Sequence, residues 1–343
     1  MSKKIVTFGE IMLRLKSPGA QRLFQSDCLE ATFGGGEANV AVSLANFGLK
    51  SHYITALPEN VVGKAAASEV AKFGVDVSGV EYMPGRLGIY FLEAGYAQRP
   101  SVVVYDRTDS VIANAAPGTF AWDEIFQDAE WFHVTGITPA ISKSAADLTI
   151  EAVRRAKALN VTVSCDLNYR AKLWKYGAEA REIMPEIIKN TDVIIANEED
   201  IQKSLGISPD AEKQGKGLDL GYYEKLTGQV LEAYPNVKKI AVTLRESISA
   251  NHNLWSGCIN NRSAFLHSKK YDITDIVDRV GGGDSFSAGL IYALSDQRED
   301  DFALEFAVGA SCLKHSISGD FNRVSTDEVM RLLGGDATGR IQR

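Results

Sequence analysis

Three glycines followed by an aspartate, Gly281-Gly282-Gly283-Asp284, form the segment of this sequence best suited to chemistry on a phosphate. They lie between a strand-like segment, Asp275–Val277, and a long apolar helix predicted over Ser285–Leu294. The first N–H groups of a helix have no partner within the helix, so glycines at its start leave an anion hole for the charge of a transferring phosphoryl group. Asp284 can then accept the proton of an attacking hydroxyl. The structural alternative is an ordinary N-cap carboxylate.

A second glycine cluster, Phe33-Gly34-Gly35-Gly36-Glu37-Ala38-Asn39, also leads into a predicted helix. Gly34 and Gly35 allow a ligand to approach the backbone, and Asn39 adds a donor and an acceptor in the first turn. A tight strand-to-helix turn explains the glycines equally well. Neither cluster has the pattern G-x-x-x-x-G-K-[ST] or G-x-G-x-x-G, which argues against a P-loop and against a dinucleotide-binding fold.

Short apolar runs alternate with helical patterns along most of the chain. Strands are predicted at Lys4–Phe8, Ser51–Ala56, Trp131–Val134, Val161–Cys165, Val193–Ala196 and Lys239–Thr243. Helices are predicted over Glu37–Phe47, Gly63–Phe73, Ser144–Ala158 and Ala178–Asn190, the first two being ended by Gly48 and Gly74. This alternation is typical of an α/β fold with a mostly parallel sheet covered by helices on both faces.

Residues 88–107 interrupt the alternation. Gly88–Glu93 and Val102–Arg107 are β-rich runs joined by Ala94–Ser101, which predicts a hairpin. Because long insertions in compact domains commonly carry function, we interpret the hairpin as a lid. An antiparallel edge extension without a functional role is the alternative.

Composition excludes several classes of partner. The 343 residues carry a formal net charge of −7, so nucleic acid is not expected as a partner, and an anionic ligand needs locally placed Arg, Lys or backbone N–H groups. No run approaches the roughly 20 apolar residues of a membrane span, and no signal-peptide pattern opens the chain. The four scattered cysteines lack C-x-x-C spacing, which is typical of reduced thiols in a cytoplasmic protein.

Both glycine clusters resemble signatures of one known family, the ribokinase-like (phosphofructokinase-B type) carbohydrate kinases. The N-terminal signature is matched by Gly34-Gly35-Gly36-Glu37-Ala38-Asn39-Val40-Ala41. The C-terminal signature, D-T-x-G-A-G-D-x-F, is matched by Asp278, Gly281, Gly283, Asp284 and Phe286, with Arg279 and Gly282 in place of the usual Thr and Ala. The resemblance implies a ribokinase-like three-layer αβα sandwich in a single domain over residues 1–343. It also implies a small β-sheet lid formed by inserted strands around 11–33 and 88–107.

The resemblance further implies the catalytic parts. Asp284 is the expected base, Gly281, Gly282 and Gly283 form the anion hole, and ATP with Mg²⁺ is the donor. The family's N-x-x-E motif, linked to magnesium and phosphate positioning, is matched by Asn197-Glu198-Glu199-Asp200, with Asp in place of the last Glu. Either Asp200 acts through a water or Glu199 contributes; an acidic helix start favoured by the dipole is the structural alternative. The family builds a monovalent-cation or phosphate environment near Arg279, so K⁺ is a candidate cofactor.

Within the family, several segments resemble 2-keto-3-deoxygluconate kinases, among them Gly88–Glu93, Val104–Arg107 and Asp166–Arg170. That substrate is an acid, and arginine offers a planar fork matched to a carboxylate. Alternate strand residues share a face, so the expected pocket wall combines Tyr90, Tyr105 and Arg107. The alternative for Arg107 is an exposed charge at a strand end. Arg170, Gly34, Gly35 and Asn39 complete the expected substrate site.

The resemblance places the nucleotide along the C-terminal part of the chain. The candidate residues are Asn197, Thr243, Arg245, Gly283 and Asn322. Dimerisation through the lid strands is also expected by resemblance. Two rival functions stay open: another sugar kinase, with fructokinase first, and a catalytically silent member that binds a sugar or a nucleotide.

Overall fold

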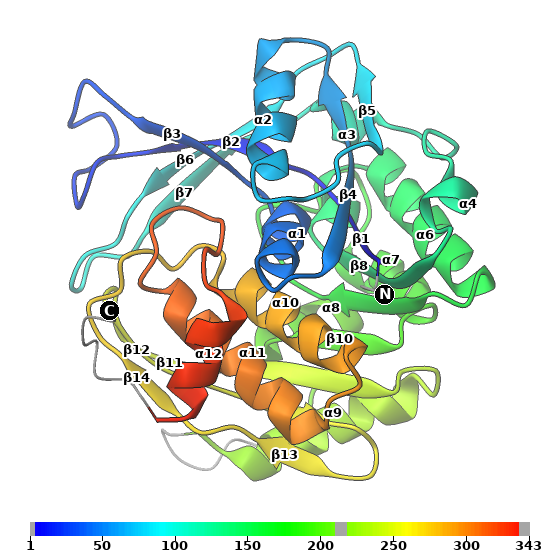
Figure 1. Ribbon diagram of the computed structural model, residues 1–343, viewed down its shortest axis with the longest axis vertical. Helices are drawn as coiled ribbons and strands as arrows, with labels where there is room; N and C mark the ends of the chain where they lie inside the picture. The colour runs from blue at the N-terminus through cyan, green and yellow to red at the C-terminus, as the bar shows by residue number, and fades with distance from the viewer. Residues whose placement is uncertain (1–3, 210–217, 336–343) are drawn as a thin grey trace.

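The computed structural model describes residues 4–209 and 218–335, and a 10-stranded sheet forms the centre of this part of the chain (Figure 1). Its order is β13-β12-β11-β10-β9-β8-β1-β4-β5, with β14 paired to β12. All pairs from β11 to β5 are parallel, and the pairs that β12 makes are antiparallel. These strands are β1 Lys4–Phe8, β4 Lys50–Pro58, β5 Val80–Met83, β8 Ala129–Thr135, β9 Thr162–Asp166, β10 Val193–Ala196, β11 Lys239–Ser249, β12 His252–Asn260, β13 Phe265–His267 and β14 Tyr271–Ile273.

Helices cover both faces of this sheet, because successive side chains of a buried strand point to opposite faces and both must be apolar. Val6 and Ile194 pack in one core with residues of α6, α7 and α9, whereas the adjacent Ile5 and Ile195 pack in another with residues of α1, α10 and α11. The helices are α1 Gly36–Asn46, α2 Val61–Ala71, α3 Val111–Asn114, α4 Trp122–Ile125, α5 Thr138–Ile141, α6 Lys143–Ala158, α7 Ala180–Ile188, α8 Glu198–Leu205, α9 Leu220–Ala233, α10 Gly282–Ser295, α11 Asp300–Lys314 and α12 Thr326–Leu333. The expected three-layer αβα fold is therefore confirmed.

A second, four-stranded sheet projects from this body, in blue and cyan at the upper left of Figure 1. Its order is β3-β2-β6-β7, with β2 Met12–Lys16, β3 Glu30–Gly34, β6 Gly88–Glu93 and β7 Val102–Asp106. The predicted hairpin is the antiparallel pair β6–β7. The central pair, β2 with β6, is parallel and joins two segments that are far apart in the sequence. We call this four-stranded sheet the lid sheet.

One predicted strand is wrong. Asp275–Val277 is irregular, and β14 ends before it at Ile273. The backbone N–H groups of Ile276 and Val277 donate to the carbonyls of Asn251 and His315, which lie in loops and not on a neighbouring strand. The chain thus leaves the sheet before it reaches the start of α10.

None of the helices in the described ranges combines the length and the apolar character that crossing a bilayer requires.

Candidate functional site

A cavity of about 1060 Å³ lies where the carboxyl ends of the parallel strands meet the inner face of the lid sheet. Ligands of open α/β sheets bind at this end of the strands. The body contributes the starts of α1, α8 and α10, and the lid sheet contributes Met12, Tyr90, Leu92, Val103 and Tyr105. The volume is that of a small-molecule site.

Backbone geometry at the start of α10 explains its glycines. The N-cap residue, Gly281, has a φ of 83°, and a Cβ there would lie 2.1 Å from the carbonyl oxygen of Asp320. A Cβ on Gly283 would meet nothing within 4 Å, so this part of the loop is open to the cavity. No side chain caps the helix, and the N–H of Gly282 donates to the carbonyl of Arg279, so the N–H groups of Gly283 and Asp284 are the candidates for the predicted anion hole. Gly281 and Gly283 line the cavity; Gly282 is turned away, and its carbonyl accepts from Ser311.

Asp284 lies in the first turn of α10 and is not its N-cap. Its Oδ2 accepts a hydrogen bond of 2.6 Å from Nδ2 of Asn39 on α1, so the two glycine clusters meet at this carboxylate. Burial raises the pKa of Asp284 to about 6, against the lowering effect of the Asn39 bond; Asp320 raises it further, while Arg170 and Lys314 lower it. A carboxylate in this range is ionised at neutral pH and still able to take a proton, as a general base must be.

In the first glycine cluster the backbone lies close to Glu10, just before β2, and to Asp320 in a C-terminal loop. Gly35 lines the cavity, and a Cβ on it would lie 2.0 Å from the carbonyl oxygen of Glu10. A Cβ on Gly34 would lie 2.0 Å from Oδ2 of Asp320, so this residue borders the cavity through Asp320. Close approach, and not only a turn, thus requires these glycines.

Tyr90 and Tyr105 face each other across β6 and β7 and line the cavity, with ring centroids 6.2 Å apart. The Tyr90 hydroxyl donates to Oδ1 of Asp320 at 2.6 Å. Arg107 lies on the same side, 5.4 Å from the Tyr105 ring, but it is buried outside the cavity wall. Its Nη2 donates to the buried carboxylate of Glu10, whereas its Nε has no partner. The alternative of an exposed strand-end charge is therefore wrong for Arg107, and its substrate role stays a prediction.

Three arginines line the opposite wall of the cavity: Arg170 after β9, Arg245 on β11 and Arg279 before α10. Burial lowers the pKa of Arg245, and the charge of Arg170 lowers it further. Burial also lowers the pKa of Arg279, and the charge of Arg245 lowers it further. Mutual repulsion of this kind is relieved by a polyanion bound among them. Thr243 lies beside Arg245 on β11 and also lines this wall.

The predicted magnesium motif forms the start of α8. Asn197 is the N-cap, and its Oδ1 accepts from the backbone N–H of Asp200. The two carboxylate oxygens of Asp200 accept from the N–H groups of Asn197 and Tyr169, so Asp200 serves the backbone. Glu199 is exposed and lines the cavity with both of them. Within residues 4–209 and 218–335, no three His, Cys, Asp or Glu side chains gather in a group that could hold a metal ion.

Asn322 is the one nucleotide candidate that the structure keeps away from the cavity wall. Its Nδ2 donates to Oγ of Ser285 and its Oδ1 accepts from the N–H of Val324. Both ends of this buried amide are thus engaged within the protein.

Sequence reasoning gave no role to three carboxylates of the cavity wall: Asp166, Asp278 and Asp320. Asp166 ends β9, and its place at the carboxyl end of a parallel strand was a signal that could have found it. Burial raises its pKa well above the usual range, and Asp200 and Asp284 raise it further. Asp320 lies in a loop with no periodic pattern, so no local signal identified it.

Comparison with known proteins gives consistent results. The family model of the pfkB family carbohydrate kinases matches residues 2–231. A 2-dehydro-3-deoxygalactonokinase of Haloferax volcanii is 32% identical over 338 residues, which cover 98% of this chain and 99% of the relative. A 2-dehydro-3-deoxygluconokinase of Bacillus subtilis is 26% identical and covers 96% and 95%. The crystal structure of a 2-dehydro-3-deoxygluconokinase from Thermotoga maritima superposes with a TM-score of 0.92 at 46% identity, covering 98% of this chain and 99% of that one.

Glu37 generates a prediction about stability. Its buried Oε1 accepts from the N–H and hydroxyl of Thr135 and from the hydroxyl of Thr138. Burial raises its pKa from 4.5 to about 7, against these bonds. The folded state therefore holds a proton that the unfolded state releases, so this group's contribution to stability falls as pH rises from about 4.5 to about 7.

Glu37→Gln keeps the accepting oxygen and removes the titration. Relative to the unchanged protein, we expect the variant to gain up to roughly 3 kcal/mol of unfolding free energy between pH 5 and pH 8, measured by denaturant titration. A difference between the two proteins that does not change with pH would contradict the assignment.

Proposed function

Because the chain belongs to the pfkB family of carbohydrate kinases, we propose that it transfers the γ-phosphate of ATP to the terminal hydroxyl of 2-keto-3-deoxygluconate. The observation that carries the proposal is Asp284, a buried carboxylate at the open start of α10, in a cavity that also holds arginines on the opposite wall. Relatives covering nearly the whole chain bear the names of kinases for the gluconate and galactonate forms of this substrate, and both stereoisomers belong to the proposal.

In this reaction Asp284 accepts the proton of the attacking hydroxyl. Asn39 orients the carboxylate through Oδ2, so that the other oxygen, Oδ1, is the one available to the substrate. The backbone N–H groups at the start of α10 stabilise charge on the transferring phosphoryl group, since they are fixed before the reaction begins. Closing of the lid sheet over the cavity excludes water that would otherwise compete as an acceptor.

Residues on the β11 side fit the nucleotide. Thr243, Arg245 and Arg279 lie along one wall, and a triphosphate there relieves the repulsion between the arginines. Mg²⁺ usually keeps several waters and takes only one or two protein carboxylates in addition to phosphate oxygens. Glu199 fits that limited role, with Asp200 acting through a water; magnesium neutralises phosphate charge when it is bound.

The acidic end of the sugar requires a locally placed cation. Arg170 lines the cavity directly, and Arg107 offers its unpartnered Nε from behind Tyr105. We therefore assign the substrate carboxylate to these two residues, with Tyr90 and Tyr105 as the wall beside the sugar. Fructokinase is the second candidate, since proteins of that name align over most of the chain at 24–25% identity.

The outer face of the lid sheet fits a second copy of this chain. It carries the apolar side chains of Leu13, Leu15, Ile89, Phe91, Val102 and Val104, of which Val104 is 49% exposed. An exposed apolar face marks an interaction site, and a two-fold dimer would bury the same face of both copies. We propose a homodimer in the cytoplasm, where the four free cysteines remain reduced.

A further positive charge lies close to the loop before α10. The ammonium of the fully buried Lys314 lies behind the anion-hole loop: its Nζ donates to the carbonyl of Ile317, and a Cβ on Gly281 would lie 3.2 Å from its Cε. We propose that this fixed charge supports the phosphate environment of the loop; because an ammonium repels K⁺, Lys314 does not belong to a potassium site.

A coupled ADP-release assay with MgATP tests the proposal directly. We expect strong preference for 2-keto-3-deoxygluconate or 2-keto-3-deoxygalactonate over fructose and ribose. Turnover of fructose alone would favour fructokinase, and no turnover with any of the four would favour a catalytically silent binding protein.

Asp284→Asn is expected to fold normally and to lose about 10²–10⁴-fold in kcat. In the unchanged protein, transfer should fall as pH drops through about 6, because protonated Asp284 cannot act as a base. Asn39→Ala removes a bond that lowers this pKa, so its acidic limb should move to higher pH. Near-normal turnover of Asp284→Asn would refute the assignment.

Arg170→Met and Arg107→Met test recognition of the acid. A charge-assisted hydrogen bond is worth about 1.5–3 kcal/mol, so each variant should raise KM for the sugar acid by roughly 10–100-fold and KM for a neutral sugar far less. An equal rise in KM for acidic and neutral sugars would show that the arginine does not bind the substrate carboxylate. Arg86→Met is the control, since Arg86 pairs with Asp106 at the surface.

Val104→Glu should convert the dimer to a monomer in sedimentation velocity, because it places a charge in the apolar face. Val61→Glu is the matched control: Val61 is an 82% exposed apolar residue on α2, outside the lid sheet. Monomeric unchanged protein, or a dimer that survives Val104→Glu, would refute this interface.

A further inference from the structure

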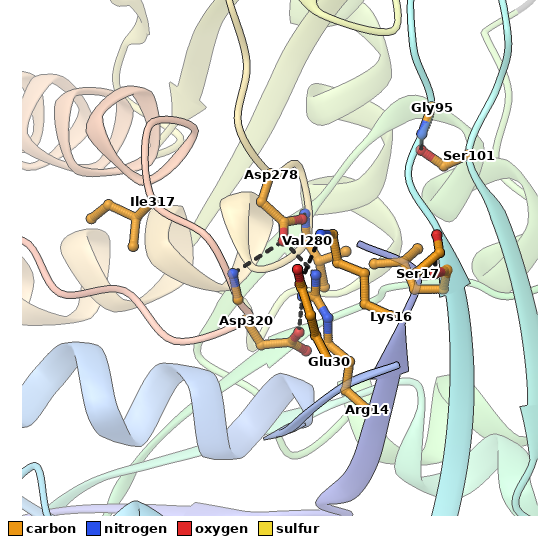
Figure 2. A network of polar contacts seen from close by, with 12 residues as sticks. Arg14, Lys16, Ser17, Glu30, Gly95, Ser101, Asp278, Val280, Ile317 and Asp320 are labelled. Carbon is orange, nitrogen blue, oxygen red and sulfur yellow. Dashed lines mark hydrogen bonds and ion pairs between the residues drawn. The ribbon is translucent and has the colours of Figure 1, made fainter. Parts of the chain in front are cut away.

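Arg14 is a fully buried cation on the inner face of the lid sheet. It lies on β2 with 1% of its side chain exposed, and its guanidinium spans two carboxylates of the body (Figure 2). Nη2 donates to Oδ2 of Asp278 and Nη1 donates to Oδ1 of Asp320, each at 2.5 Å. Although burial alone would lower it, the charges of Asp320 and Asp278 raise the pKa of Arg14, so this side chain stays charged.

Both carboxylates belong to the wall of the anion hole. Asp278 precedes Gly281 by three residues; its Oδ1 accepts from the N–H of Val280 and its Oδ2 accepts from the N–H of Gly319. The carbonyl oxygen of Asp320 lies close to Gly281, the N-cap of α10, where a Cβ would be 2.1 Å from it. The two acids that Arg14 joins therefore fix the two segments that shape the loop before α10.

Two further contacts join the lid sheet to the same segments. Tyr90 on β6 donates to the Asp320 oxygen that Arg14 also contacts. Val280, in the loop itself, packs against the apolar cluster of Met12, Tyr90 and Leu92 on the inner face of the lid sheet. Strands β2 and β6 thus hold the loop through ion pairs, a hydrogen bond and apolar contact.

Guanidinium is needed here because of its shape. Its planar fork reaches two carboxylates at once, whereas an ammonium is a point charge. Lys314, another buried cation nearby, donates to the carbonyl of Ile317, so it does not replace the link to the lid sheet.

We propose that Arg14 is a positioning residue that couples the seating of the lid sheet to the geometry of the anion hole. The inference rests on the proposed phosphoryl transfer for its catalytic consequence, but the coupling itself is a property of the ligand-free protein. The ion pairs of Arg14 hold the lid sheet against the body, and they thereby fix the N–H donors at the start of α10 in position. Transition-state stabilisation depends on such placement more strongly than ground-state binding does.

The first test measures the coupling without substrate. Hydrogen–deuterium exchange of the ligand-free Arg14→Met and Arg14→Lys variants should show faster exchange in residues 278–284 and 88–93, with the parallel strands β8 to β10 unchanged. The control is Lys16→Met: Lys16 lies two residues further along β2 on the same face, and it pairs with Glu30 of β3, within the lid sheet (Figure 2). That variant should leave 278–284 unchanged.

The second test measures catalysis per folded protein, corrected by active-site titration. Arg14→Met should lower kcat by about 10²-fold with KM for MgATP within about threefold, as expected when catalytic donors are misplaced. Arg14→Lys restores one of the two ion pairs, and it should recover part of that loss.

Three outcomes would overturn the inference. The first is a hydrogen exchange rate that rises equally across the whole chain in the Arg14 variants. The second is an unchanged kcat in correctly folded Arg14→Met. The third is a Lys16→Met control that also shows faster exchange in 278–284 and a lower kcat. Absence of sugar-kinase activity in the unchanged protein would refute the proposed function instead, and the exchange measurement would still decide whether Arg14 couples the lid sheet to the loop.

Discussion

Burial of negative charge at the start of α10 is the constraint around which this structure is arranged. Asp284 and Asp166 lie in one cavity, and burial raises the pKa of each. A carboxylate removed from water needs hydrogen bonds or cations, and Asp284 obtains them from three distant parts of the chain. Asn39 comes from α1, Arg170 from the segment after β9, and Lys314 from the end of α11.

The parallel sheet makes this convergence possible. Strands β8, β9 and β10 end at the same edge, so the segments that follow them meet without any long loop. Gly281 and Gly35 then allow backbone to approach within distances that a side chain would block. Gly281 lets Asp320 pack against the start of α10, and Gly35 lets Glu10 pack against the start of α1.

Periodicity and glycine punctuation predicted the body of the fold well. The predicted strand Val193–Ala196 is β10 itself, and the predicted helix over Ser144–Ala158 differs from α6 by one residue. Such local signals cannot reveal which partner a strand or a side chain finds. Three such contacts join residues that are distant in sequence. Strand β2 pairs in parallel with β6, Arg107 forms an ion pair with Glu10, and Asn322 donates a hydrogen bond to Ser285. Ile276 and Val277 are β-branched, which favours a strand at Asp275–Val277, but the hydrogen bonds of this segment go to loops.

The parallel pairing in the lid sheet also bears on synthesis of the chain. Strands β2 and β3 leave the ribosome before β4, α2 and β5, and the second partner of β2, strand β6, begins only at Gly88. Until then, β2 presents an unpaired edge beside apolar side chains, which is a template for pairing with another chain. Both strands are short, and Lys16 with Glu30 places charges at the end of the pair where the connecting loop begins. These features limit aggregation of the nascent chain during the time in which β4, α2 and β5 are synthesised and β6 is still absent.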